Sequence, residues 1–471
     1  MKADLVLTGG TVVTEHGPEH ADIVVRSGRI AAIQAHGVER FDDADEQIDV
    51  RGLHVFPGGI DPHVHLGDQG QSEFEDFATG TASCAAGGLT TVIDMPLNLP
   101  PTIDAATLEA RRREVAPKAY VDFGLWGGIV PGNLSELEPM ARAGALAFKA
   151  FVCDAVDWFR ASDADLFEGM REAVRLDRPV GVHSENDDIT ARLRARLRAA
   201  GRTDLDAHGE SRPEVTEWEA IERVTLLARE TGARTQVVHI STGEGVDTCT
   251  AARRAGARVG AEVTMHHLTL DETALRENGT FAKCAPPLRA RHQVEALWRR
   301  LLAGEVSNIG SDHSPATFAQ KDLALHEHWD VPDGITGTQT LMPLLLSEGV
   351  HKRGLALEEF ARLTATAAAK MFGLHPRKGA IRVGADADFA IADLDARFTI
   401  TPERLLYKCP WSPNVGTEVQ GEIVRTIVRG TTVFNDGELV GEPGAGVYLH
   451  GMELAEERDS AQRRGLEVMS R

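Results

Sequence analysis

The chain lacks the features of a disulfide-rich, membrane-spanning or nucleic-acid-binding protein. Its five cysteines form no CxxC pair among 471 residues, which argues against a disulfide framework and for a reducing compartment. No apolar run approaches the roughly 18 residues of a membrane span, and the polar start Met1-Lys-Ala-Asp4 predicts no signal peptide. Basic residues are outnumbered, 50 against 71 acidic ones, and the net charge of −21 disfavours non-specific contact with nucleic acid or anionic membranes. We therefore expect a cytoplasmic protein with neither of these partners.

Length and composition allow one large globular domain and a smaller one. Of the 471 residues 42% are hydrophobic, so the chain can bury a sizeable core. Short strand patterns broken by glycines fill residues 4–55, and similar patterns return at 388–392 and 423–429. Because neither end has enough strands to close a core alone, we expect both termini to form one small β-sandwich. The expected division is residues 1–55 and 376–440 for the sandwich, 56–375 for an inserted catalytic barrel, and 441–471 for a charged, solvated tail.

The middle of the chain alternates strand-like apolar runs with helical stretches. This alternation predicts parallel βα units, and eight such runs predict an α/β fold of the closed (β/α)8, or TIM-type, barrel. A doubly wound open sheet is the alternative, but no GxGxxG motif follows the first run. The eight runs are residues 55–66, 90–95, 121–127, 146–152, 179–184, 235–241, 258–264 and 306–311.

The first of these runs carries two histidines and a carboxylate at alternate positions. Residues i and i+2 of an extended strand face the same side, so Asp61, His63 and His65 project together. Two imidazoles on one face are half of a metal site. The simpler interpretation is a pair of hydrogen-bonded histidines at a strand end.

Further isolated polar residues lie in or at the ends of the later strands. In a (β/α)8 barrel the carboxyl ends of the strands converge on one mouth, where the chemistry takes place. A hydrogen bond or a misread helix surface could explain each residue singly, but their shared position favours a joint metal site. The candidate ligands are His63, His65, Lys149, His183, His239 and Asp312.

The chemistry of this set suits a transition metal. Four imidazoles and one carboxylate suit Zn²⁺, and Mn²⁺, Co²⁺, Fe²⁺ and Ni²⁺ share this preference. Lys149 is the exception because an ammonium group repels cations. It can serve only if it is neutral or converted to an anion.

The ligand set resembles that of the cyclic amidohydrolases, a group that holds allantoinases, hydantoinases, dihydropyrimidinases and dihydroorotases. The resemblance runs from Leu5 to about Gly430. It implies that carbon dioxide carbamylates Lys149, which then bridges two divalent metal ions, most simply zinc. It also implies that Asp312 is both a ligand and the catalytic base that passes a proton to the departing ring nitrogen. The implied reaction is hydrolytic opening of a cyclic amide by a homodimer or homotetramer.

The motifs that bear on the substrate divide between branches of this group. Dihydroorotases place an arginine two residues after the second histidine, where this chain has Gly67, although residues 262–268 resemble the dihydroorotase form of strand seven. D-selective hydantoinases carry a tyrosine soon after the lysine, and residues 152–156 contain none. We therefore expect allantoin as the substrate, with 5-substituted hydantoins or dihydropyrimidines as the alternative. Allantoinase-like segments are 79–81, 85–91, 94–98, 122–128, 283–289 and 311–315, and hydantoinase-like segments are 318–321, 331–334 and 375–379.

The resemblance also places substrate contacts. Backbone groups around Val263 and Asp333 would hold the imide edge of the ring. Allantoinases usually have a Ser-Cys-Pro-His-Tyr run on strand seven, and this chain departs from it at residues 263–267. His266 and His267 could contact the substrate or support the site from behind, and His313 is expected to support Asp312.

Two interpretations from other classes remain for comparison. Relatives in the dihydropyrimidinase branch have lost ligands and serve only as scaffolds, but all six ligand positions are intact here. A barrel that binds ureides without turnover is the third interpretation, and adding substrate separates it from an enzyme.

Overall fold

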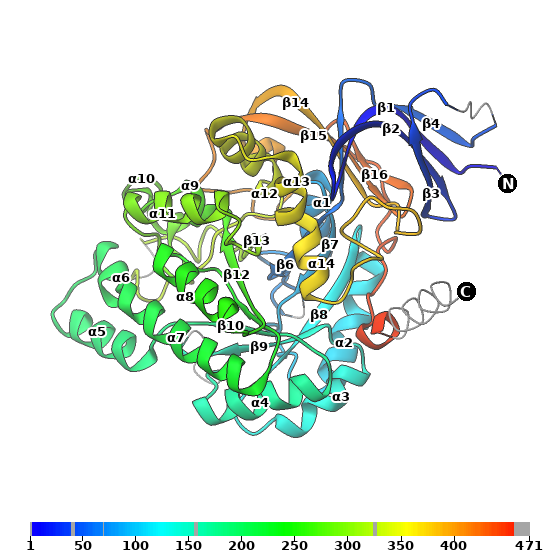
Figure 1. Ribbon diagram of the computed structural model, residues 1–471. Helices are drawn as coiled ribbons and strands as arrows, with labels where there is room; N and C mark the ends of the chain where they lie inside the picture. Colours follow the sequence, from blue (N-terminus) through cyan, green and yellow to red (C-terminus); the bar gives the residue numbers. More distant parts are fainter. Residues whose placement is uncertain (1, 39–42, 69, 155–158, 324–326, 456–471) are drawn as a thin grey trace.

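The computed structural model describes residues 2–38, 43–68, 70–154, 159–323 and 327–455 (Figure 1). Eight parallel strands follow one another in chain order, from β6 to β13, in one sheet. The sheet closes because His313 forms a parallel bridge with Val64 at the end of β6. All eight strands predicted for the barrel are present. They are β6 Gly59–Val64, β7 Leu89–Asp94, β8 Asp122–Gly128, β9 Ala147–Phe151, β10 Val180–His183, β11 Thr235–Val237, β12 Val259–Thr264 and β13 Asn308–Gly310.

The first predicted run, residues 55–66, is two strands rather than one. Its first part, β5 (His54–Pro57), pairs with strands of the terminal sheet, whereas β6 pairs with β7 of the barrel. The chain passes from one sheet to the other at Gly58, where a Cβ would lie only 2.2 Å from Oγ1 of Thr90. A glycine therefore allows the crossing at this crowded point.

Helices cover the outside of the barrel (Figure 1). Several begin with a capping box, in which Asp76, Asp104 or Ser162 accepts a hydrogen bond from the third backbone N–H of the helix. In the described part of the chain, no helix is long and apolar enough to cross a membrane. The α-helices are α1 Phe77–Ala86, α2 Ala105–Val115, α3 Leu137–Arg142, α4 Asp163–Arg175, α5 Asp187–Ala199, α6 Asp206–Ser211, α7 Glu214–Thr231, α8 Gly243–Arg254, α9 Met265–Thr269, α10 Ala274–Asn278, α11 Arg291–Leu302, α12 Leu341–Leu345, α13 Leu357–Ala361 and α14 Ala367–Met371. Short 3-10 turns are η1 Ala116–Lys118, η2 Leu134–Glu136, η3 Gly279–Ala282 and η6 Pro402–Arg404, and π-helical turns are η4 Leu346–His351 and η5 Arg362–Thr366.

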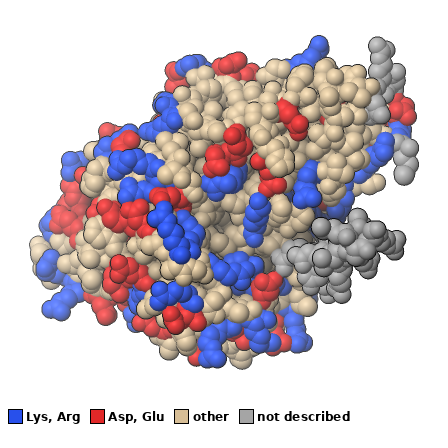
Figure 2. All heavy atoms as spheres, in the orientation of Figure 1, with Lys and Arg blue, Asp and Glu red and all other residues tan. Residues whose placement is uncertain are grey.

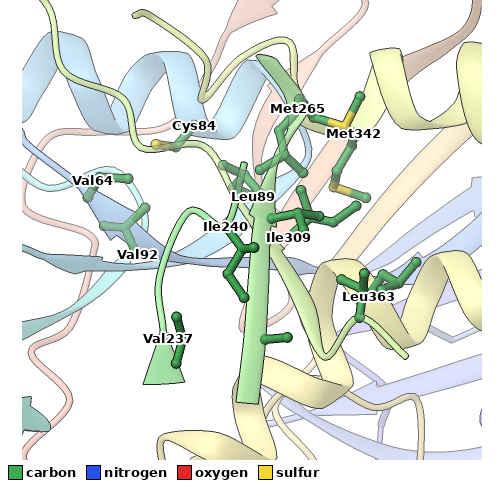
Figure 3. Packing of buried hydrophobic residues seen from close by; sticks show 14 of the residues in the cluster. Val64, Cys84, Leu89, Val92, Val237, Ile240, Met265, Ile309, Met342 and Leu363 are labelled. Atoms are coloured by element: carbon green, nitrogen blue, oxygen red, sulfur yellow. The ribbon is translucent and has the colours of Figure 1, made fainter. Parts of the chain in front are cut away.

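The main core lies between the barrel strands and these helices. Ile309 of β13, Met342 of α12 and Leu363 of η5 are fully buried members of one apolar cluster (Figure 3). Burying a side chain of this size contributes about 1.5–3 kcal/mol. Because successive residues of a strand face opposite sides, the outward positions form this core and the inward positions remain for polar groups.

Both ends of the chain combine into one small β domain, as predicted. Its strands form a continuous mixed sheet in the order β17-β16-β15-β14-β5-β1-β2-β3, with β4 also paired to β1. The pairing of β14 with β5 joins the two ends, and in Figure 1 the blue strands of the N-terminal part and the orange strands of the C-terminal part lie in the same region of the molecule. The strands are β1 Leu5–Thr14, β2 Gly17–Arg26, β3 Arg29–Ala35, β4 Glu46–Asp49, β14 Phe389–Thr399, β15 Glu418–Val428, β16 Thr431–Asn435 and β17 Glu438–Leu439.

Part of the segment predicted to be a charged, solvated tail instead packs alongside β8. The backbone N–H of Phe123 donates to the carbonyl of Val447 at 3.0 Å, and the N–H of Leu449 donates to the carbonyl of Phe123 at 2.7 Å. The side chains of Leu449 and Leu454 are buried. Residues 456–471 of the predicted tail lie outside the described part of the chain.

The surface carries charges of both signs. On the face shown in Figure 2, basic and acidic side chains are interspersed over the helices. Arg194 of α5, for example, pairs with Asp154 at 2.7 Å, and Lys370 pairs with Glu15 at 2.8 Å. Such exposed pairs contribute about 0–1 kcal/mol each, so the stability of the fold depends on buried interactions instead.

A buried lysine joins the barrel to the terminal sheet. The Nζ atom of Lys378 lies 2.7 Å from Asp122 at the start of β8 and 2.6 Å from Asp388 next to β14. Asp386 approaches the same atom at 3.2 Å. All four side chains are buried. One ammonium group therefore balances carboxylates from both parts of the molecule.

We expect Lys378→Met to lower the free energy of unfolding by about 3–5 kcal/mol. Among the described residues, it leaves the buried carboxylate of Asp388 without an ion pair, whereas Asp122 keeps its pair with Arg429 and Asp386 its pair with Arg377. Urea unfolding of the purified variant measures this loss. Lys370→Met is the matched control, since that lysine is 57% exposed in its pair with Glu15, and its effect should stay within about 0.5 kcal/mol. Equal unfolding midpoints for the two variants would contradict the assigned role of Lys378.

Candidate metal centre and active site

The six predicted ligands line one cavity at the barrel mouth. The cavity has a volume of about 420 Å³. His63 and His65 stand at the end of β6, Lys149 lies in β9, and His183 is the last residue of β10. His239 and Asp312 each lie two residues beyond the end of a strand, after β11 and β13. Five strands of the barrel thus bring these side chains together, as the sequence predicted.

Asp312 lies against the two histidines of β6. Its Oδ1 atom is 3.1 Å from Nε2 of His63 and 3.3 Å from Nε2 of His65. The ligand atoms of these three residues lie within 4.8 Å of one another, a spacing that suits one metal ion. Burial favours a raised pKa for Asp312, but His63 and His65 outweigh it and hold the pKa well below its usual range. Asp312 is therefore a carboxylate that can bind a cation or accept a proton.

The other two histidines form the opposite side of the centre. The rings of His183 and His239 pack edge to face with centroids 4.4 Å apart, and the rings of His63 and His239 are 5.3 Å apart. The Nδ1 atom of His239 is buried and has no hydrogen-bond partner in the part of the chain that the structure describes. An imidazole nitrogen left without a partner in a buried site is well suited to bind a metal ion.

Lys149 is buried between these groups without a hydrogen bond. Its side chain is fully buried, its Nζ atom has no hydrogen-bond partner among the described residues, and this atom lies 4.8 Å from the centroid of the Phe151 ring. Burial lowers the pKa of Lys149 to about 8, against the opposing effect of Asp312 and Glu262. A buried ammonium without a counter-ion is costly. The position of Lys149 therefore suits a carbamate better than a free ammonium group. With the lysine carbamylated, the six residues form a donor set that fits two divalent ions.

Supporting groups behind the ligands were not identified from the sequence. Nε2 of His183 lies 2.9 Å from Oε2 of Glu185, which also forms an ion pair with Arg212. Nδ1 of His63 donates to Oε1 of Glu262 at 2.7 Å. Glu262 alternates with Val263 along β12, so the inward side of that strand was the signal available in the sequence. Arg212 lies on a loop and has no comparable signal.

Asp61 has a different role from the two histidines that follow it. It is buried behind the cavity, and its Oδ1 accepts hydrogen bonds from the N–H of His63 and the N–H of Ser311, both at 3.1 Å. Burial raises the pKa of Asp61 to about 7. Its carboxyl group joins the first and last strands of the barrel and does not reach the cavity.

The predicted substrate contacts occupy different environments. Asp333 lines the cavity, and its carboxylate lies 2.7 Å from Nζ of Lys283. The side chain of Val263 is buried in the apolar core, away from the cavity. Both residues stay predictions as substrate contacts.

His266 and His267, whose role the sequence left open, and His313, which was expected to support Asp312, are all buried and do not line the cavity. His267 bonds to Oγ1 of Thr264 at 2.7 Å and donates to the carbonyl of Pro286 at 3.1 Å. His313 accepts from the N–H of Gly337 at 3.1 Å. Nε2 of His266 has no partner. The hydrogen bonds of His267 and His313 hold the loops beside the ligands in place.

A (β/α)8 barrel with four histidines, a lysine and an aspartate around its mouth is typical of metal-dependent barrel hydrolases. The model of the amidohydrolase family matches residues 54–433. An allantoinase from Solibacter usitatus is 45% identical over 445 residues, which cover 94% of this chain and 96% of that protein. An allantoinase from Rubrobacter xylanophilus is 45% identical over 459 residues, covering 97% and 99%.

A solved structure gives the same result for the fold. The L-hydantoinase (dihydropyrimidinase) from Arthrobacter aurescens superposes with a TM-score of 0.92 at 34% identity, covering 95% of this chain and 100% of that one. The chain belongs to the amidohydrolase family. It is a hydrolase that acts on carbon–nitrogen bonds in cyclic amides.

Gly310 has no side chain and so leaves room for the side chains of Glu262 and His63. A Cβ at this position would lie 3.0 Å from Cδ of Glu262 and 3.2 Å from Cβ of His63. We expect Gly310→Ala to cost about 1–3 kcal/mol of stability through overpacking and to weaken zinc binding. Thermal unfolding and the zinc content of the purified protein measure the two effects.

Gly209 provides the matched control for this substitution. It lies in α6, and a Cβ there would meet no atom within 4 Å. Gly209→Ala should leave both the stability and the zinc content close to those of the wild type. A Gly310→Ala protein with unchanged zinc content would show that His63 tolerates displacement.

Proposed function

We propose that the chain opens the ring of a cyclic ureide, with allantoin as its substrate, in a centre that holds two divalent metal ions. The observation that carries this proposal is the convergence of five candidate ligands around the sixth, the buried Lys149, whose Nζ atom has no hydrogen-bond partner among the described residues. Relatives at 45% identity over nearly the whole chain are named allantoinases, which supports allantoin over other rings.

Carbamylated Lys149 and the other five residues would hold two zinc ions, which would supply an activated water molecule and a Lewis acid for the ring carbonyl. Mn²⁺, Co²⁺, Fe²⁺ or Ni²⁺ could replace zinc with the same donors. His63, His65 and Asp312 would hold one ion, His183 and His239 the other, and Lys149 would contribute to both.

Asp312 is the residue proposed to move the proton. It is a carboxylate at the base of the cavity, so it can accept a proton from the attacking water and donate it to the departing ring nitrogen. Phe74, Leu97 and Phe151 give the cavity apolar walls that limit access of bulk water. Asn98 also lines the cavity. Its side-chain NH2 group donates to Met95 and Thr102, which leaves its amide oxygen as an acceptor for an N–H group of a ureide.

The alternative substrates are 5-substituted hydantoins and dihydropyrimidines. The structural similarity to the Arthrobacter aurescens L-hydantoinase (dihydropyrimidinase) favours this alternative. Dihydroorotate is less suited, because its carboxylate requires a cation in the cavity. Arg212 lines the cavity wall, but it is already paired with Glu185. Location in the cytoplasm and assembly into a homodimer or homotetramer are further predictions, and five free, buried cysteines support the former.

The substrate prediction is tested by ring opening of allantoin, hydantoin, 5-substituted hydantoins, dihydrouracil and dihydroorotate at neutral pH. The zinc-loaded protein should show its highest kcat/KM with allantoin. Asp312→Asn is the control and should lose at least about 100-fold in kcat with every ring. A preference for a substituted hydantoin or dihydrouracil would transfer the assignment to the alternative. If no ring opens although zinc is bound, the proposed substrate class is wrong.

The carbamate proposal predicts the behaviour of Lys149→Ala. This variant should lose most of its activity and metal, because the bridging anion is absent. Short carboxylic acids such as acetate or propionate should restore part of both, since a free carboxylate can occupy the vacated space. Zinc content and ring-opening rate, each measured with and without the acid, test this.

His183→Ala is the control for this rescue, because an acid cannot replace its imidazole. Wild-type activity should also be unchanged by the acids. Full activity of Lys149→Ala without any acid would refute the carbamate proposal.

A further inference from the structure

Strand β12 contributes no ligand to the proposed metal centre. Its inward-facing residue Glu262, however, lies directly behind that centre. The side chain of Glu262 is 1% exposed, so its carboxyl group has almost no contact with water. A buried carboxyl group requires hydrogen-bond partners. Those partners come from residues on two other strands that hold metal ligands.

The first partner is the ring of His63. Nδ1 of His63 donates to Oε1 of Glu262 at 2.7 Å. A neutral imidazole that donates through Nδ1 carries its lone pair on Nε2, which here points toward Asp312 at 3.1 Å. Glu262 therefore selects the tautomer of His63 in which the nitrogen facing the centre can bind a metal ion.

The second partner is the backbone around His239. The N–H of His239 donates to the same Oε1 atom at 3.2 Å, and the N–H of Ile240 donates to the main-chain carbonyl of Glu262 at 2.8 Å. His239 has a φ of +40°, a left-handed conformation that is unfavourable for a residue with a Cβ. These two hydrogen bonds hold the strained turn that directs the His239 ring into the cavity.

The chain also keeps space for this arrangement. Gly310 faces Glu262, where a Cβ would lie 3.1 Å from Oε1. The next inward layer, away from the mouth, has a contact of its own that does not involve Glu262, because Gln236 donates to Asn308 at 2.6 Å. Within the described residues, the hydrogen bonds of the Glu262 side chain are those to His63 and His239.

We propose that Glu262 is a positioning residue shared by both halves of the metal centre. One carboxyl group fixes the tautomer of His63 on one side and the backbone that directs His239 on the other. The inference rests on the proposed metal-dependent function, because it assigns Glu262 to that same centre. Loss of Glu262 should therefore weaken binding of both zinc ions and not of one alone.

The test compares zinc binding by the wild type, Glu262→Gln and Glu262→Ala. Gln keeps an acceptor oxygen but lacks the charge, whereas Ala removes both hydrogen bonds. We expect zinc affinity to fall by about 10-fold in the Gln variant and about 100-fold in the Ala variant. Zinc per folded chain after dialysis, and competition with a chromophoric chelator, measure the affinity. Excess zinc should restore ring opening by the Gln variant, because all six ligands remain.

Glu217→Gln is the matched control. Glu217 is also 1% exposed, and its carboxylate accepts from the backbone N–H of Ser241 at 3.0 Å and lies 3.4 Å from Arg289. It contacts none of the six ligands, so this variant can lose stability but should bind zinc as the wild type does.

The outcomes separate the inference from the proposed function. Two zinc ions bound with wild-type affinity by folded Glu262→Ala would overturn the inference while the function stands. If the Ala variant does not fold, an affinity of Glu262→Gln within twofold of the wild type overturns it instead. Loss of zinc from Glu217→Gln equal to that from Glu262→Gln would reduce the role of Glu262 to general stability. A wild-type chain that binds no zinc would overturn the proposed function, and the inference with it.

Discussion

Closure of the barrel between its first and last strands is the constraint on which the rest of the structure depends. The N–H of His65 donates to the carbonyl of His313 at 2.8 Å, and Asp61 accepts from both His63 and Ser311. These contacts join residues about 250 positions apart in the chain. Without them, Asp312 would not lie against the two histidines of β6, and the centre would remain two separate groups of side chains.

Within the closed barrel, some polar groups of the proposed centre have hydrogen-bond partners, and others have none and could bind a metal ion. Among the described residues, Glu262 and Glu185 each bond to a histidine of the proposed centre, while Nζ of Lys149 and Nδ1 of His239 have no hydrogen-bond partner. An unsatisfied buried polar group is costly, and native proteins retain few of them. Lys149 and His239 both line the cavity together with the other proposed ligands, so the binding of metal ions there would reduce the cost that folding leaves.

Stability and chemistry are located at opposite ends of the barrel. Lys378 and its carboxylates lie at the amino-terminal end of β8, where the terminal sheet is attached, and the ligands lie at the carboxyl ends of the strands. Such separation is typical of (β/α)8 enzymes, because loops at the mouth can change without disturbing the opposite face. The two ends of this chain form a sheet that supports the barrel and leaves the mouth open.

Local patterns in the sequence were enough to predict the eight barrel strands, the pairing of the two termini and the candidate ligands at the strand ends. Strand alternation and the spacing of His63 and His65 depend only on neighbouring residues, so they are readable without a structure. The division of the first run at Gly58, the attachment of residues 447–449 to β8, and the partners of Asp61 and Glu262 were decided by tertiary structure alone. Glu262 and His63 are separated by 199 positions, and no periodicity links them. Only the closed barrel determines which inward side chains meet and which remain free to bind a metal ion.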